Sequence, residues 1–102
     1  MITVNVASDF SRHPAGRFLN DGPYSGEAFR RRFLEPNLAK QQDIVIELDG
    51  ARGYGSSFLE EAFGGLVRKG FSKEVIRARI SLHASNPSLK QEILEYIEQA
   101  MP

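Results

Sequence analysis

Apolar and polar residues follow the spacing of β-strands in three segments of the chain. Residues 2–6 (Ile-Thr-Val-Asn-Val) alternate strictly, which predicts a strand with one buried face. Residues 43–49 form an almost continuous apolar run rich in β-branched side chains, which predicts a central strand covered on both faces. Residues 76–83 alternate again between aliphatic and polar side chains, so the pattern predicts a third strand there.

Helical spacing fills most of the intervals between these segments. Ser25 is positioned to cap a helix, which Pro36 then kinks or restarts. Apolar residues between positions 58 and 67 recur at i, i+1, i+4 and i+5, which predicts a helix with one broad apolar face. Asn86 followed by proline is typical of a helix start, here of a last helix. Residues 7–26 are instead rich in glycine and proline, which predicts a long loop.

The order of these elements indicates a single α/β domain over residues 1–102. Helices between successive strands imply right-handed parallel crossovers. Residues 17–19 could add a short extended piece within the long loop. We therefore expect a small mixed sheet of about four strands, with three helices packed against it. Gly64 and Gly65 interrupt the second helix, which predicts that this helix approaches the sheet closely.

Composition and charge narrow the functional classes. The formal net charge is zero, so no overall field attracts nucleic acid or acidic lipid, and we expect neither as a partner. The chain has no cysteine, which excludes disulfides, thiolate catalysis and cysteine-based zinc sites. No His, Asp and Glu cluster has metal-ligand spacing, and we expect neither a metal nor a cofactor. Without a long apolar run or a secretory signal, a cytoplasmic protein is expected.

The densest candidate chemistry lies in the turn and helix start of residues 49–65, DGARGYGSSFLEEAFGG. Gly50 and Gly55 have the GxxxxG spacing of a phosphate loop, but Ser56 stands where that motif needs lysine. The turn also has the context of a nucleophile elbow, but Leu59 replaces its final glycine.

Neither histidine completes a catalytic set with these serines. His13 precedes the turn and His83 follows it, and no acidic residue combines with either of them into a convincing triad. We therefore expect no catalytic activity. Ser57 followed three residues later by Glu60 has the spacing of a capping box, so a purely structural role for this serine is the plainest interpretation.

Several exposed or half-exposed side chains remain to be assigned. Tyr54 lies at the tip of the turn and is expected to be exposed beside Arg52, where it could act as an interface hot spot. The arginines at 30–32 are expected to spread over a solvated helix surface. Arg77 and Arg79 share one face of the predicted strand, where they could line a binding surface or pair with glutamates of a covering helix. Three aromatic residues of the long loop are expected to pin it to the core: Phe10, Phe18 and Tyr24.

Two long stretches of the chain resemble a known family. They are GRFLNDGPYSGEAFRRRFLEP (residues 16–36) and ELDGARGYGSSFLEEAFGGLVR (residues 47–68). With the strand–helix tail, they resemble the STAS-like domain of unknown function, and more broadly the STAS domains of anti-sigma-factor antagonists. In those antagonists a strand ends in Asp-Ser-Ser-Gly, and a partner kinase phosphorylates one serine at the following helix start. Ser57 lies at the matching position beside Ser56, although Gly55 and Phe58 replace the acidic residue and the glycine.

This resemblance implies a non-catalytic regulatory domain that docks on a partner protein. The antagonists suggest a histidine-kinase-like ATPase regulator as the partner class, with reversible association gated by phosphorylation of Ser57. The implied surface is the turn and helix start together with the loop at 16–26. Its expected contact residues are Arg52, Tyr54, Gly55, Ser56, Ser57 and Phe58. The alternative is a module that senses a small ligand, a nucleotide or another anion at the same helix N-terminus.

Overall fold

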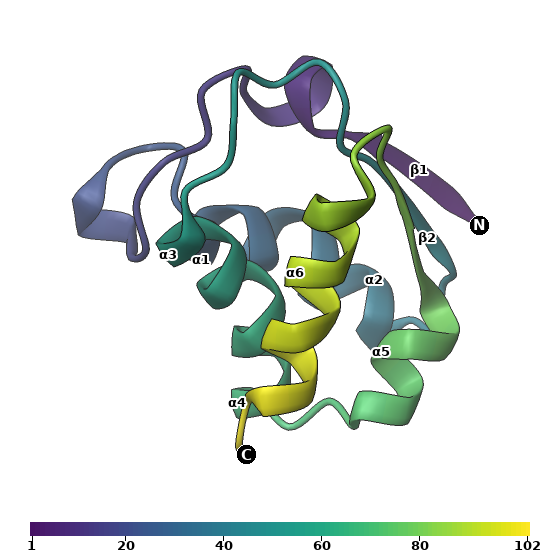
Figure 1. Cartoon of the computed structure of the whole chain (residues 1–102). Coiled ribbons are helices and arrows are strands. Elements are labelled where there is room, and N and C mark those ends of the chain that lie inside the picture. The colour runs from purple at the N-terminus through teal and green to yellow at the C-terminus, as the bar shows by residue number, and fades with distance from the viewer.

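Three parallel strands form the sheet in the computed structural model, which describes residues 1–102 (Figure 1). They are β1 (Ile2–Asn5), β2 (Ile44–Glu47) and β3 (Ile80–His83), with β2 in the middle. All pairs are parallel, so the expected mixed sheet of about four strands is corrected to three parallel strands. Residues 17–19 add no strand, because the Asp21 carboxylate binds the backbone N–H groups of Arg17 and Phe18 and curls the loop.

Helical segments are more numerous than the three expected. Residues 26–39 form one continuous stretch of α1 (Gly26–Phe29), the π-helical segment η3 (Arg30–Leu34) and α2 (Glu35–Ala39). Residues 56–68 form another, made of α3 (Ser56–Leu59), η4 (Glu60–Gly64) and α4 (Gly65–Arg68). The remaining segments are α5 (Lys73–Arg79), α6 (Pro87–Gln99) and two short ones, η1 (Val6–Phe10) and η2 (Leu19–Asp21). No helix is both long enough and apolar enough to cross a membrane.

Helix α5 occupies half of the segment predicted as the third strand. The Ser72 hydroxyl accepts a hydrogen bond from the backbone N–H of Val75 and starts this helix, which places Ile76 in the core. Arg77 and Arg79 therefore do not share a strand face. Arg77 pairs with Glu98 of α6, as the second interpretation of these arginines expected, and Arg79 pairs with Asp43 at 3.0 Å.

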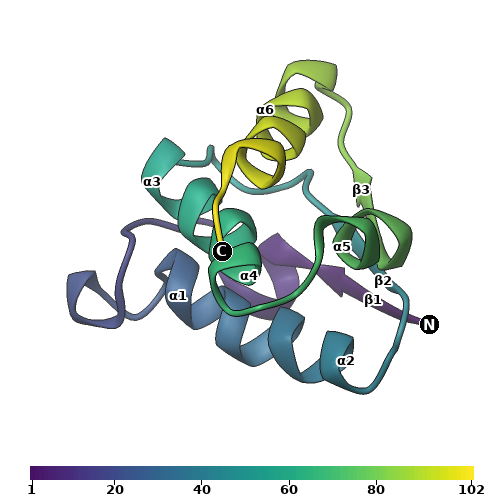
Figure 2. The ribbon, with the colours of Figure 1, turned by 90° about the horizontal axis from the view of Figure 1, so that it is seen from below.

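The helices cover one face of the sheet and leave the other open (Figures 1 and 2). The strand order β1-β2-β3 advances in one direction, and right-handed crossovers then place both connections on the same side. Val4, Ile46 and Leu82 lie side by side on the covered face and are buried. The expectation that the central strand is covered on both faces is therefore wrong. The open face carries mainly polar side chains, those of Thr3, Asn5, Val45, Glu47, Ser81 and His83.

Candidate functional site

The turn after β2 is closed by hydrogen bonds at both ends. The Tyr54 hydroxyl donates to the carbonyl oxygen of Leu48 at 2.6 Å, which ties the end of the turn to its beginning. The backbone N–H of Arg52 donates to the carbonyl of Arg12 at 2.8 Å, which joins the turn to the long N-terminal loop. Gly53 has φ of 143°, a conformation that L-residues with a side chain rarely adopt. The turn is thus fixed in shape and presents the Arg52 side chain to solvent.

Two of the expected contact residues face inward. The Tyr54 side chain is half-buried and packs on the Phe58 ring, with 6.1 Å between the ring centroids. Burial raises the pKa of the Tyr54 phenol well above its usual range, and the nearby charge of Asp49 adds to this. Phe58 is 1% exposed and belongs to the core. The spacing of four between these two aromatic residues is the signal that sequence reasoning passed over. Of the six residues, Arg52, Gly55, Ser56 and Ser57 are exposed.

The expected capping box between Ser57 and Glu60 does not form. The helix begins at Ser56, two residues earlier than a Ser57 cap requires, with Gly55 as N-cap and no side-chain oxygen on its first N–H groups. Glu60 instead binds Arg17 at 2.5 Å and Arg68 at 2.8 Å. These charge-assisted bonds are stronger than a bond from the Ser57 backbone N–H, so the glutamate turns away from it. Ser57 lies past the N-cap, within the first turn, and its hydroxyl makes no hydrogen bond within the protein.

An arginine–glutamate cluster lies beneath the helix start. It consists of Arg17, Arg30, Glu35, Glu60, Glu61 and Arg68. The Arg30 guanidinium is buried and donates to the Glu61 carboxylate at 2.5 Å and to the Glu61 carbonyl at 2.8 Å. The hydrogen bond from Arg68, followed by that from Arg17, holds the pKa of the Glu60 carboxyl below its usual range. The same Glu60 carboxylate raises the pKa of Arg68.

Arg30 therefore departs from the expectation that residues 30–32 form a solvated surface, whereas Arg31 and Arg32 are exposed. The two glycines of the second helix explain how Arg30 is accommodated. A methyl group at Gly65 would overlap the Arg30 guanidinium, and one at Gly64 would overlap the Glu60 carboxylate. These glycines reflect the packing of charged side chains between helices, and not the expected approach to the sheet.

The loop at 16–26 is anchored next to the helix start. The backbone N–H groups of Gly26 and Glu27, at the start of α1, donate to the loop carbonyls of Gly16 and Arg17, at 2.9 and 3.0 Å. The Arg17 side chain then reaches across to Glu60. Figure 1 shows this loop beside α1 and α3. The loop is therefore held mainly by backbone and ionic contacts.

The three aromatic residues of residues 7–26, the predicted long loop, divide into two groups. Phe10 is buried, as expected, and makes edge-on contacts with Tyr24 and Phe29 at 5.5 and 5.3 Å between centroids. Phe18 and Tyr24 remain 48% and 43% exposed. Tyr24 still packs on the buried Phe10 ring, as expected, whereas Phe18 has no such ring contact. Leu19 between them is 47% exposed. Three exposed large apolar side chains thus lie on this loop.

The polar side chains at the ends of β2 and β3 pair with one another. The His83 ring lies 2.9 Å from the Glu47 carboxylate on the open face of the sheet. Asp49 accepts hydrogen bonds from the Ser85 hydroxyl and backbone at 2.6 and 3.0 Å, and the first of these lowers the pKa of Asp49 the most. The ring of neither histidine is bonded to a serine. No three His, Asp or Glu side chains are grouped so that they could hold a metal ion.

Comparison with known proteins places the chain in a family. A family model described as "STAS-like domain of unknown function (DUF4325)" matches residues 25–90, which include α1, the turn and β3. Neither the curated proteins nor the solved structures contain a match. The matched region covers well over half of the chain, so the resemblance inferred from the motifs is confirmed. The protein belongs to the family of STAS-like domains of unknown function.

Proposed function

We propose that the protein is a non-catalytic regulatory domain that docks on another protein. The docking surface consists of the exposed side chains Phe18, Leu19, Tyr24, Arg52, Ser56 and Ser57. One observation carries this proposal. Six large hydrophobic side chains are exposed in the whole chain, and three of them lie within this single loop beside the helix start. Aromatic side chains at the centre of a contact supply much of the binding energy in protein interfaces.

The anchoring of the loop supports the same proposal. Arg17 is bonded to Glu60 and lies 3.5 Å from Glu61, while the loop backbone is bonded to α1. A surface that is already fixed loses less conformational entropy on binding. The exposed apolar residues are therefore presented in one arrangement.

Phosphorylation of Ser57 is proposed as the gate of this association. The Ser57 hydroxyl is exposed, has no partner in the protein and lies at a helix N-terminus, where negative charge is favoured. A phosphate there carries about −1.5 to −2 charges. Residues three apart on a helix are neighbours, so this phosphate would compete with Glu60 for Arg17. A move of Arg17 from Glu60 to the phosphate would change how the loop is held against the helix start. The likeness to STAS antagonists supports a histidine-kinase-like ATPase regulator as the partner.

A photo-crosslinking experiment tests the docking surface. A photoreactive phenylalanine replaces Leu19 in one variant and Val75, which is also exposed but lies on α5, in the other. We expect one discrete crosslinked protein from the first variant and none from the second. With that protein purified, Leu19→Ser should raise the Kd by about tenfold or more, whereas Val75→Ser should change it by less than about twofold. Equal crosslinking at both positions would contradict the proposal.

Mass spectrometry of protein from its native cells tests the gate. We expect a phosphate on Ser57, and a Ser57→Glu variant whose Kd for the partner differs from that of Ser57→Ala. Ser56 offers the matched control, because it is equally exposed but lies one residue closer to the N-cap. Ser57 peptides that are always unmodified would refute the gate and leave the docking surface standing.

One observation favours the alternative, a sensor of a small ligand, nucleotide or anion. The first N–H groups of α3 have no side-chain cap and could bind a negatively charged group. However, the turn lines none of the four cavities of the protein. Thermal denaturation with ATP or inorganic phosphate separates the two functions, since a ligand at 100 times its Kd stabilises by about 2.7 kcal/mol. We expect no rise in Tm with either compound.

A further inference from the structure

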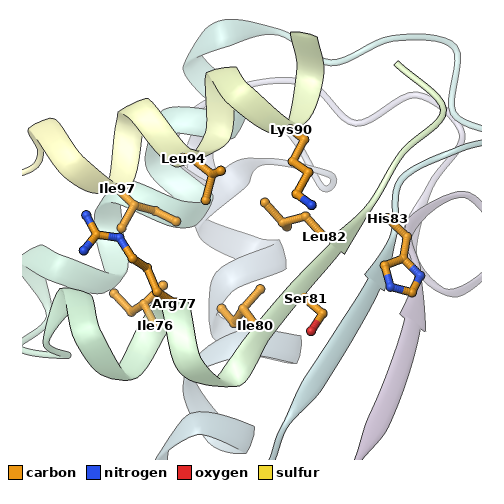
Figure 3. Close-up of a pocket in the computed structure, with 9 residues that line it drawn as sticks. All are labelled: Ile76, Arg77, Ile80, Ser81, Leu82, His83, Lys90, Leu94 and Ile97. Atoms are coloured by element: carbon orange, nitrogen blue, oxygen red, sulfur yellow. The ribbon is translucent and has the colours of Figure 1, made fainter. Parts of the chain in front are cut away.

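A second surface lies between β3 and α6, and it has no part in the docking surface. A groove of about 450 Å³ separates these two elements (Figure 3). Its floor is apolar and is formed by Ile76, Ile80, Leu82, Leu94 and Ile97. Figure 3 shows Lys90 and Leu94 of α6 pointing toward β3 across this groove.

The groove follows the free edge of the sheet. β3 pairs with β2 on one side only. All four residues of β3 line the groove, so the groove runs along the whole strand.

The hydrogen bonds of β3 show which backbone groups point to this edge. The carbonyl oxygen of His83 accepts a hydrogen bond from the backbone N–H of Leu48, at 2.9 Å. Leu48 directly follows β2, so this carbonyl points toward β2. The backbone N–H and C=O groups of successive residues point to opposite edges of a strand. Those of Ile80 and Leu82 therefore point away from β2. The N–H of Ile80 is already bonded to Ile76. The carbonyl of Ile80 and both backbone groups of Leu82 therefore face the groove and are free to pair with an added strand.

The two charged side chains that line the groove have the same sign. They are Arg77 and Lys90, and no carboxylate lines the groove. Arg77 is paired with Glu98, and His83 lies against Glu47. Lys90 has neither an ion pair nor a hydrogen bond within the protein. The one unpaired charge at the groove is thus a cation, and it lies beside the apolar floor.

We propose that the β3 edge binds an extended segment of a partner protein as an added strand. Alternate side chains of that segment face α6, where an apolar one fills the floor and an acidic one pairs with Lys90. The side chains between them lie beside Ser81 and His83 on the open face and are polar. At about 3.3 Å per residue, the length of β3 fits a segment of roughly four paired residues. The partner motif is therefore short, extended, apolar and acidic.

Selection from displayed peptides tests this surface. Short random peptides on phage are selected against the intact protein, and the enriched sequences are synthesised. We expect apolar and acidic residues two positions apart, and an amide resonance of Leu82 that shifts on binding. Lys90→Glu should weaken binding by about tenfold or more, whereas Lys69→Glu, an exposed lysine outside the groove, should change the Kd by less than about twofold.

Methylation of alternate peptide nitrogens gives a second readout. Binding should be lost when the methylated nitrogens face β3 and kept when they face away, because only the first set donates to the strand. Leu19→Ser should leave peptide binding unchanged, which separates this surface from the docking surface. Enriched peptides without an acidic residue, equal effects of Lys90→Glu and Lys69→Glu, or insensitivity to methylation would each overturn the proposal. Binding of octanoate without any peptide binding would assign the groove to a small amphiphile and overturn it too.

Discussion

Gly26 and Gly65 set how closely the two long helical stretches approach each other. A methyl group at Gly26 would overlap the carbonyl oxygen of Phe58, and one at Gly65 would overlap the buried Arg30 guanidinium. The absence of side chains at these positions lets Arg30 reach Glu61. A buried charge of this kind is tolerated only when it is paired, since an unpaired one is costly. Two glycines and one ion pair therefore form a single packing unit.

We expect Gly26→Ala to destabilise the protein by about 1–3 kcal/mol, because the added methyl group must push apart two backbone segments. The free energy of unfolding in urea measures this. Gly55→Ala is the matched control, because nothing lies within 4 Å of an added methyl group there and the backbone has an ordinary φ of −67°. At this N-cap the cost should stay below about 1 kcal/mol. Equal losses in both variants would contradict the close approach.

The lowered pKa of Glu60 predicts an acid-sensitive fold. A carboxyl whose pKa is lower in the folded state stabilises fully above its ordinary pKa of about 4.3, and this contribution is lost as the pH falls through the lowered value. The Tm should therefore decrease as the pH falls below about 4.3. Glu60→Gln removes the titrating carboxyl, so the Tm of this variant should fall less steeply over the same pH range. Parallel curves for the two proteins would show that Glu60 is not responsible.

At the scale of elements, three serines precede predicted or observed helices but only two of them cap one. Ser25 and Ser72 accept hydrogen bonds from the backbone N–H three residues later, both at 3.1 Å. Ser57, which has the better sequence motif, accepts none. The difference arises because the helix begins at Ser56 with Gly55 as its N-cap, so Ser57 lies inside the first turn and not at the capping position.

Alanine substitutions separate these roles. Ser25→Ala should cost about 0.5–2 kcal/mol of unfolding free energy, because it removes a cap. Ser57→Ala should change the stability by less than about 0.5 kcal/mol, because an exposed side chain without partners is lost. Urea denaturation of both variants measures the contrast. If both substitutions lowered the unfolding free energy equally, Ser57 would have to cap the helix as Ser25 does.

The elements with the clearest local patterns could be predicted from the sequence. β1, β2, the Ser25 cap and α6 lie where alternation, β-branched runs and cap residues indicated them. Residues 76–79 could not be predicted in this way, because a short apolar alternation also fits one turn of helix, and the Ser72 cap decides between them. The family and the exposed serines of the turn were found from motifs. The burial of Arg30 and the half-burial of Tyr54 were not, because they depend on contacts between distant segments.

At the scale of the whole molecule, the sheet has one covered and one open face. Parallel sheets are usually covered on both faces, and the polar residues of the open face are what allows this one to meet water. Neighbouring residues on β2 show the contrast, since Ile46 is fully buried and Val45 is partly exposed.

Two substitutions to threonine test this one-sided sheet. Val45→Thr keeps shape and β-propensity on the open face, so it should change the unfolding free energy by less than about 0.5 kcal/mol. Ile46→Thr places a hydroxyl in the apolar core, so it should cost about 1–3 kcal/mol or more. Chemical denaturation of the two variants measures this. Similar losses at both positions would mean that another element covers the open face.

The same strand order also governs how copies of the protein could meet. β1 and β3 are edge strands that run in the same direction, so joining the β1 edge of one molecule to the β3 edge of another would continue the sheet in a head-to-tail manner. Such a contact leaves a fresh edge at each end and grows into an open filament rather than a closed dimer. The four-residue length of the strands and the charge of Lys90 beside β3 both oppose it. A lysine that selects an acidic partner segment would thus also keep the protein from polymerising.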